Sequence, residues 1–142
     1  MIQKIRKNQD NKYVTVRLCL MAATLFVILS AFAAGAFAGD DFEKLKGRWQ
    51  RPDGGYVIEI RNVKSDGDME AAYFNPNPIH VAVSRASQTD GILRILIELR
   101  DVNYPGSLYN LLYDPKEDIL RGTYYQAVAK ESYEVYFVRM KP

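Results

Sequence analysis

The chain has 142 residues, of which 48% are hydrophobic and 25% charged, and its formal net charge is +2 at pH 7. Five of the 19 basic residues but only one of the 17 acidic residues lie in the first 38 positions, so residues 39–142 hold 14 basic and 16 acidic side chains. These 104 residues suffice for one domain and are too few for two. Their charge balance excludes a basic surface of the kind that binds nucleic acid.

The N-terminal segment has the pattern of a secretory signal peptide. A basic start is followed by an uncharged apolar run, which ends in the small-residue triplet Ala36-Phe37-Ala38. This pattern predicts a signal peptide at 1–38 with cleavage after Ala38. The run is also long enough to be an uncleaved anchor, in which case the leader would be the only contact with a membrane. We therefore expect an exported protein, periplasmic or secreted.

The remaining segment, 39–142, is expected to be a single domain without a disulfide, because Cys19, the only cysteine, lies in the leader. Such a domain must be stabilised by packing alone. An exported protein that lacks cysteine favours a bacterial periplasm as its location.

Along the chain, 39–46 is expected to form one helical turn that packs Phe42 and Leu45 beneath a sheet. After it, turn residues recur at short intervals between runs rich in Val, Ile, Tyr and Phe, a pattern typical of all-β folds. Eight strands are predicted, at 48–51, 56–62, 69–74, 79–86, 92–100, 107–113, 119–127 and 132–140. Asp-Gly and Gly-Gly pairs supply hairpin turns, and 114–118 reads as a type I turn.

Apolar and polar residues alternate within these strands. One set of alternate positions is apolar: Tyr56, Ile58 and Ile60; Leu93, Ile95, Ile97 and Leu99; Tyr133, Val135 and Phe137. One dry and one wet face indicate a half-buried antiparallel sheet. Because an open sheet would leave two exposed edges, we predict an up-and-down meander that closes into a small barrel. Such an interior is either filled by side chains or holds one small ligand.

The first and last predicted strands carry residues that pair in a known family of barrels. Gly47-x-Trp49 on the first strand and Arg139 near the end of the last resemble the pattern of the calycins (lipocalins, fatty-acid-binding proteins and avidins). The resemblance implies that Trp49 closes the barrel base and that Arg139 lies across it. The second lipocalin motif, a Thr-Asp-Tyr type triplet, is absent. The overall pattern is also similar to small exported bacterial β-proteins.

Candidate catalytic and metal-binding residues are few. His80 is the only histidine and no nucleophile or carboxylate stands at a spacing that marks a partner. Asp66, Asp68 and Glu70 read as a hairpin turn instead of a calcium loop, which needs more oxygen ligands. Glu59 and Glu98 fall on wet faces and read as solvated. We therefore expect no enzyme activity, no cofactor and no metal site.

Binding residues are predicted inside the barrel. Asn110 lies in line with Leu108 and Leu112, and Gln126 with Tyr124, so two amides and a phenol would point into an apolar interior. The opposite face of 107–113, which carries Tyr109, is the alternative inner face. The leading hypothesis is a small, partly apolar ligand bound by Tyr109, Asn110, Tyr124 and Gln126.

Two stiff loops provide an alternative function. The loops at 75–78 and 103–107 contain Asn-Pro-Asn-Pro and Asn-Tyr-Pro-Gly, and loops on a rigid scaffold often carry function. The residues that they and the adjoining strand display are Phe74, Asn75, Asn77, Asn103 and Tyr104. These suit a polar-aromatic ligand or an envelope protein, so the protein is alternatively an interaction or enzyme-inhibitor module.

Overall fold

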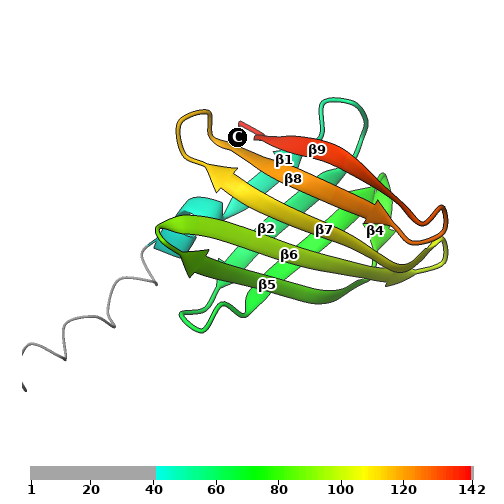
Figure 1. Cartoon of the computed structure of the whole chain (residues 1–142), viewed down its shortest axis with the longest axis horizontal. Helices are drawn as coiled ribbons and strands as arrows, with labels where there is room; N and C mark the ends of the chain where they lie inside the picture. Colours follow the sequence, from blue (N-terminus) through cyan, green and yellow to red (C-terminus); the bar gives the residue numbers. More distant parts are fainter. Residues whose placement is uncertain (1–40, 142) are drawn as a thin grey trace, which may run out of the picture. The chain divides into compact units, whose positions relative to one another are not determined.

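The computed structural model describes residues 41–141, which form one compact unit. The predicted signal peptide, its cleavage point and Cys19 lie outside the described residues. A 3-10 turn, η2 (Glu43–Leu45), precedes nine strands (Figure 1). The strands are β1 (Gly47–Gln50), β2 (Val57–Val63), β3 (Met69–Asn75), β4 (Asn77–Ile79), β5 (Val81–Thr89), β6 (Ile92–Asp101), β7 (Tyr104–Asp114), β8 (Ile119–Gln126) and β9 (Glu131–Arg139).

The strands form one antiparallel sheet that curls into a nearly closed barrel. The order across the sheet is β4-β3-β2-β1-β9-β8-β7-β6-β5, so the last strand pairs with the first through Trp49 and Arg139. All other neighbours are consecutive in the chain, as in a meander. The predicted all-β meander barrel is confirmed, and it is compatible with a calycin-like fold.

The predicted strand at 79–86 is in fact two strands that meet at His80. β4 pairs with β3 on one side, whereas β5 pairs with β6 on the other. The change occurs because the His80 backbone binds the β6 end instead: its N–H donates to Asp101 Oδ2 at 2.9 Å and its carbonyl accepts from Arg100 N at 3.0 Å. The chain therefore switches neighbours without a turn, and nine strands replace the predicted eight.

A short seam joins β5 to the β2–β3 hairpin and nearly closes the barrel. Asp68 forms an isolated antiparallel bridge with Arg85, and Ala86 N donates to Gly67 O at 2.8 Å. Ser84 Oγ also donates to the Met69 carbonyl. These contacts satisfy part of the two sheet edges, which would otherwise be exposed.

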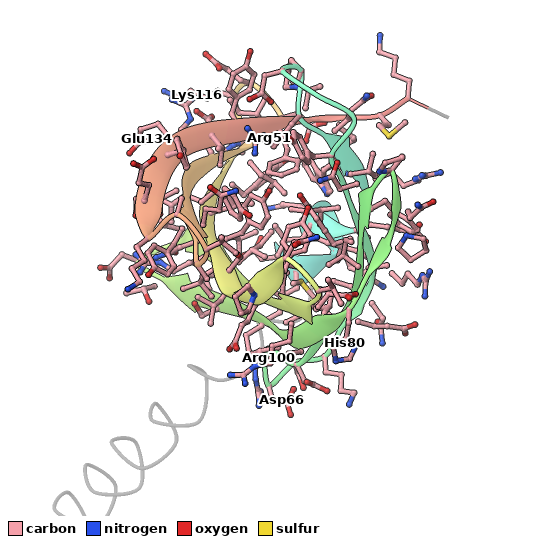
Figure 2. The ribbon with its side chains drawn as sticks, turned by 90° about the vertical axis from the view of Figure 1, so that its right-hand side faces the viewer. Arg51, Asp66, His80, Arg100, Lys116 and Glu134 are labelled. Carbon is pink, nitrogen blue, oxygen red and sulfur yellow. The ribbon has the colours of Figure 1, made fainter. Side chains whose placement is uncertain are left out.

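The barrel interior is filled by the side chains that alternation predicts to point inward. Figure 2 looks into the ring of strands and shows side chains across its centre. Ile58, Ile60, Val135 and Phe137 are buried, as are Leu93, Ile95, Ile97 and Leu99. Tyr133, predicted on the same dry face, is instead 43% exposed because it lies near the start of β9, at the rim.

The two ends of the barrel differ. At one end, here called the closed end, η2 covers the core with Phe42 and Leu45, which are buried as predicted. At the other, the open end, the turns that follow β1, β3, β6 and β8 meet (Figure 1). No helix within residues 41–141 has the length and apolar character to cross a bilayer.

Candidate ligand-binding site

The closed end is sealed by Trp49 and Arg139. The indole is fully buried, and its Nε1–H donates to the Leu45 carbonyl at 2.9 Å. The guanidinium of Arg139 lies 4.0 Å from the centre of the Trp49 ring, within the range of a cation–π contact. It also donates to the carbonyls of Lys46 (2.6 Å) and Lys44 (2.7 Å). Arg139 therefore ties the last strand to the segment that precedes the first.

Two further residues, Asp118 and Gly47, help to hold Arg139 in place at the closed end. Asp118 accepts from Arg139 Nε at 2.6 Å and from Nη2 at 2.9 Å, and these hydrogen bonds lower the pKa of its carboxyl. Gly47 has φ +130°, and a Cβ at this position would lie 2.9 Å from Arg139 Nη1. The glycine of the Gly-x-Trp pattern thus leaves room for the guanidinium.

Four tyrosines, here called the tyrosine layer, cross the barrel between the apolar core and the open end: Tyr73, Tyr104, Tyr109 and Tyr124. The rings of Tyr109 and Tyr124 stack at 4.4 Å, and the hydroxyls of Tyr73 and Tyr109 are 3.0 Å apart. Burial raises the pKa of Tyr73, and it raises that of Tyr109 to about 12 against the opposing hydrogen bonds from Tyr73 and Arg51. Burial therefore keeps the phenols of Tyr73 and Tyr109 protonated at neutral pH.

A cleft with a volume of about 150 Å³ lies above the tyrosine layer, at the open end. Its walls come from the β1–β2 and β6–β7 turns and from residues of β3, β7 and β8. The lining residues are Arg51, Tyr56, Asn75, Asn103, Tyr104, Tyr124 and Gln126. Three phenol rings, three amides and one guanidinium combine apolar surface with donors and acceptors, which suits a small molecule with both apolar and polar parts.

Arg51 supplies the only formal charge among these lining residues. Its guanidinium lies 4.5 Å from the centre of the Tyr56 ring, and its Nη1 is 3.5 Å from the Tyr109 hydroxyl. Burial lowers the pKa of Arg51, but hydrogen bonds to Asp53 and Tyr109 outweigh burial and raise it. The side chain labelled Arg51 in Figure 2 lies within the ring of strands near the open end.

The structure brings two predicted sets of residues into one site. Tyr124 and Gln126, predicted as interior ligand contacts, line the same cleft as Asn75, Asn103 and Tyr104 from the two stiff loops. The loops touch directly, because Asn75 Nδ2 donates to the Tyr104 hydroxyl at 2.6 Å. Tyr109 is fully buried and is not a cleft-lining residue, although its ring stacks on that of Tyr124, which is one.

Other predicted site residues lie elsewhere. Asn110 is exposed on the outer wall, because Tyr109 and Leu111 occupy the inner face of β7. The first of the two faces considered for this strand is therefore the outer one. Asn77 is exposed, and the Phe74 ring lies 5.9 Å from the Arg48 guanidinium, away from the cleft-lining residues.

Sequence reasoning missed Arg51 and Tyr56. An arginine before Pro52 resembles an ordinary turn residue, and only the fold brings it to Tyr109, 58 positions away. One signal was present: Arg51 lies two residues after Trp49, so it continues the inward-facing positions of that strand.

The groups considered for catalysis lie on the surface. His80 is exposed, and the two glutamates pair with arginines of their own strands, Glu59 with Arg61 at 2.9 Å and Glu98 with Arg100 at 2.8 Å. In the 65–70 hairpin Asp68 pairs with Lys64 at 2.7 Å. Within residues 41–141, no three His, Cys, Asp or Glu side chains gather as metal ligands would.

A larger hollow of about 670 Å³ lies on the outer wall. It is lined by Leu112, Glu117, Ile119, Arg121, Gly122, Glu134, Val135 and Tyr136. The hollow faces solvent across β7, β8 and β9, and its arginine pairs with Asp114 at 2.5 Å. It shares no lining residue with the cleft at the open end.

The chain matches no protein-family model, and neither the curated proteins nor the solved structures give a match. The function must therefore be inferred from the geometry of the molecule.

Proposed function

We propose that this is an exported, non-catalytic barrel that binds a small, partly apolar molecule in the cleft at its open end. One observation carries the proposal: aromatic rings, amides and one guanidinium from two turns and three strands converge on a single cleft above a filled core. None of the lining residues is a nucleophile paired with a base, which supports binding without catalysis. The closed end, with Gly47, Trp49 and Arg139, supports kinship with lipocalin- or avidin-type calycins.

The size of the cleft limits the ligand. Small-molecule sites usually enclose roughly 300–1,000 Å³, whereas this cleft has about 150 Å³. That space corresponds to about five water molecules, at roughly 30 Å³ each. The ligand is thus either a small molecule or a larger one that inserts only one group.

NMR titration with a library of small aromatic and aliphatic compounds tests this proposal. The side-chain amides of Asn75, Asn103 and Gln126 report on the cleft, and that of Asn110 on the outer wall serves as an internal control. We expect some compounds to shift the first three amide signals and not the fourth. Native mass spectrometry of the protein purified from its own host should also show a bound mass. A library that leaves all four signals unchanged, together with a bare native mass, contradicts the proposal.

The second candidate is an interaction module that recognises an envelope protein with the 75–78 and 103–107 loops. Exposed valines at the tips of two turns at the open end favour it: Val102 is 81% exposed and Val128 62% exposed. A photo-crosslinking residue at position 102 should give a discrete adduct in cells, and one at Ile92, exposed at the closed end, should not. Equal labelling from both positions would remove this candidate.

A further inference from the structure

The guanidinium of Arg51 is held in place by its neighbours, but not all of its N–H donors make strong hydrogen bonds. Its side chain is only 11% exposed, and the Tyr56 ring lies 4.5 Å from it. Its contact with the Tyr109 hydroxyl is long, at 3.5 Å. A guanidinium has five N–H donors in a fixed planar arrangement. Arg51 therefore keeps donor capacity beside the cleft, in an orientation that neighbouring rings fix.

Asp53 occupies the strongest binding edge of this guanidinium. Its two carboxylate oxygens accept from Arg51 Nε at 2.9 Å and from Nη2 at 2.5 Å, the bidentate geometry that arginine offers to carboxylates. The hydrogen bond from Arg51 lowers the pKa of Asp53. Yet Asp53 is 64% exposed in the turn between β1 and β2, and it is not among the cleft-lining residues. A competing carboxylate could replace it without disturbing the core.

The charge of the cleft also favours a carboxylate ligand. Its lining holds one cation and no carboxylate, so an anionic ligand is favoured over a cationic one. The rings of Tyr56, Tyr104 and Tyr124 supply apolar surface beside the guanidinium. The volume admits a group about as large as one side chain.

We propose that the cleft binds a carboxylate attached to an aromatic or branched apolar group of side-chain size, and that this carboxylate takes the place of Asp53 on Arg51. The inference rests on the proposed ligand-binding function and specifies the ligand class. The same chemistry has two sources, a free small acid or the last residue of a polypeptide. A polypeptide would also contact Val102 and Val128 at the rim.

The test compares matched probes on the full chain, produced for export and purified as the cell leaves it. The acid probe is 3-methylbutanoate, its neutral control is 3-methylbutanamide, and a short acetylated peptide ending in leucine represents the polypeptide source. Calorimetry gives affinities, and the amide signals of Asn75, Asn103 and Gln126 locate binding. We expect the acid to bind at least about tenfold more tightly than the amide, as hydrogen bonds to charged groups suggest.

Variants of the two paired residues give opposite predictions. Arg51→Met should weaken acid binding about ten- to a hundredfold, and Arg51→Lys should fall between, because lysine cannot form the bidentate pair. Asp53→Asn should instead tighten acid binding about two- to fivefold, since it removes a competing exposed ion pair. Arg121→Met removes an Arg–Asp pair on the outer wall and should change nothing. Melting curves identify any variant that fails to fold, and Asp53→Asn remains informative in that case.

The outcomes separate this inference from the proposed function. If the acid and the amide bind the cleft equally, or Asp53→Asn weakens the acid, the ligand class is wrong although binding stands. If neither probe nor any library compound moves the cleft amides, both fail. Peptide binding tighter than that of the free acid supports a polypeptide source, and exclusion of the peptide supports a small acid.

Discussion

At the level of single residues, Trp49 is the largest fully buried side chain and lies at the closed end. The ring is fully buried, packs edge-on to Tyr113 at 6.0 Å, and stacks under Arg139. Removing a large buried aromatic side chain costs about 3–5 kcal/mol. We predict that Trp49→Ala lowers the free energy of unfolding by about this amount in urea titrations. Tyr136→Ala, at a half-exposed ring on the outer wall, is the control and should cost much less. An unchanged midpoint for Trp49→Ala would refute its sealing role.

Tyr109 is expected to make the folded state less stable at alkaline pH. Its pKa is raised from 10 to about 12, chiefly by burial, so the folded state favours the protonated phenol. Its contribution to stability is therefore complete below pH 10 and is lost as the pH rises from 10 through 12. We predict that the wild type loses about 2 kcal/mol more than Tyr109→Phe over this interval. Unfolding titrations at several pH values measure the difference. Parallel curves for wild type and Tyr109→Phe would contradict the prediction.

At the level of elements, the seam between β5 and the β2–β3 hairpin depends on Gly67. Its φ is +83°, and a Cβ there would lie 2.1 Å from the Ala86 carbonyl oxygen. Gly91 makes a matched control, because its φ is +77° but nothing lies within 4 Å of the added Cβ. Gly91→Ala should cost only the backbone strain, about 1–2 kcal/mol. Gly67→Ala should cost clearly more and should speed hydrogen exchange in β5. Equal losses of unfolding free energy for the two variants would contradict the prediction and show that the seam can shift to accommodate a Cβ at position 67.

Strands that pair with the same neighbours throughout are the ones that the sequence predicts well. In β6 the alternation of Leu93, Ile95, Ile97 and Leu99 with charged residues gives the buried face correctly. Around His80 the prediction is wrong, because a change of partner strand involves no turn residue and leaves no local pattern. In β7 both faces carry leucine, so alternation alone could not choose between Tyr109 and Asn110.

Part of the candidate site could likewise be predicted from the sequence, because some of its residues stand out locally. Tyr124, Gln126 and the loop residues were each noticed as aromatic rings or amides at turns or on inner faces. That they line one cleft depends on barrel closure, which brings together turns up to 75 positions apart in the chain, from Arg51 to Gln126. The importance of Arg51 comes from its contacts with Asp53 and Tyr109, and the second of these exists only in the folded barrel.

At the level of the whole molecule, the filled core sets a limit on ligand size. A barrel of about eight strands is just wide enough either to be filled or to hold one ligand. In this nine-stranded barrel, buried side chains from η2 through β9 form one continuous cluster. Within the part of the chain that the structure describes, the cleft at the open end offers a guest about 150 Å³. Long-chain ligands can therefore enter only by displacing packed side chains.

A series of straight-chain carboxylic acids of increasing length tests this limit. Each CH₂ that leaves water should add about 0.8 kcal/mol, or about fourfold in affinity. We predict that the gain stops after roughly five non-hydrogen atoms. At that length the cleft is full, if each atom takes about the 30 Å³ that one water molecule occupies in the liquid. Calorimetry across the series locates the plateau, and Gln126→Ala, which enlarges the cleft, should move it to a longer chain. A steady gain up to chains of fatty-acid length would mean that the tyrosine layer opens and that the core accepts ligands after all.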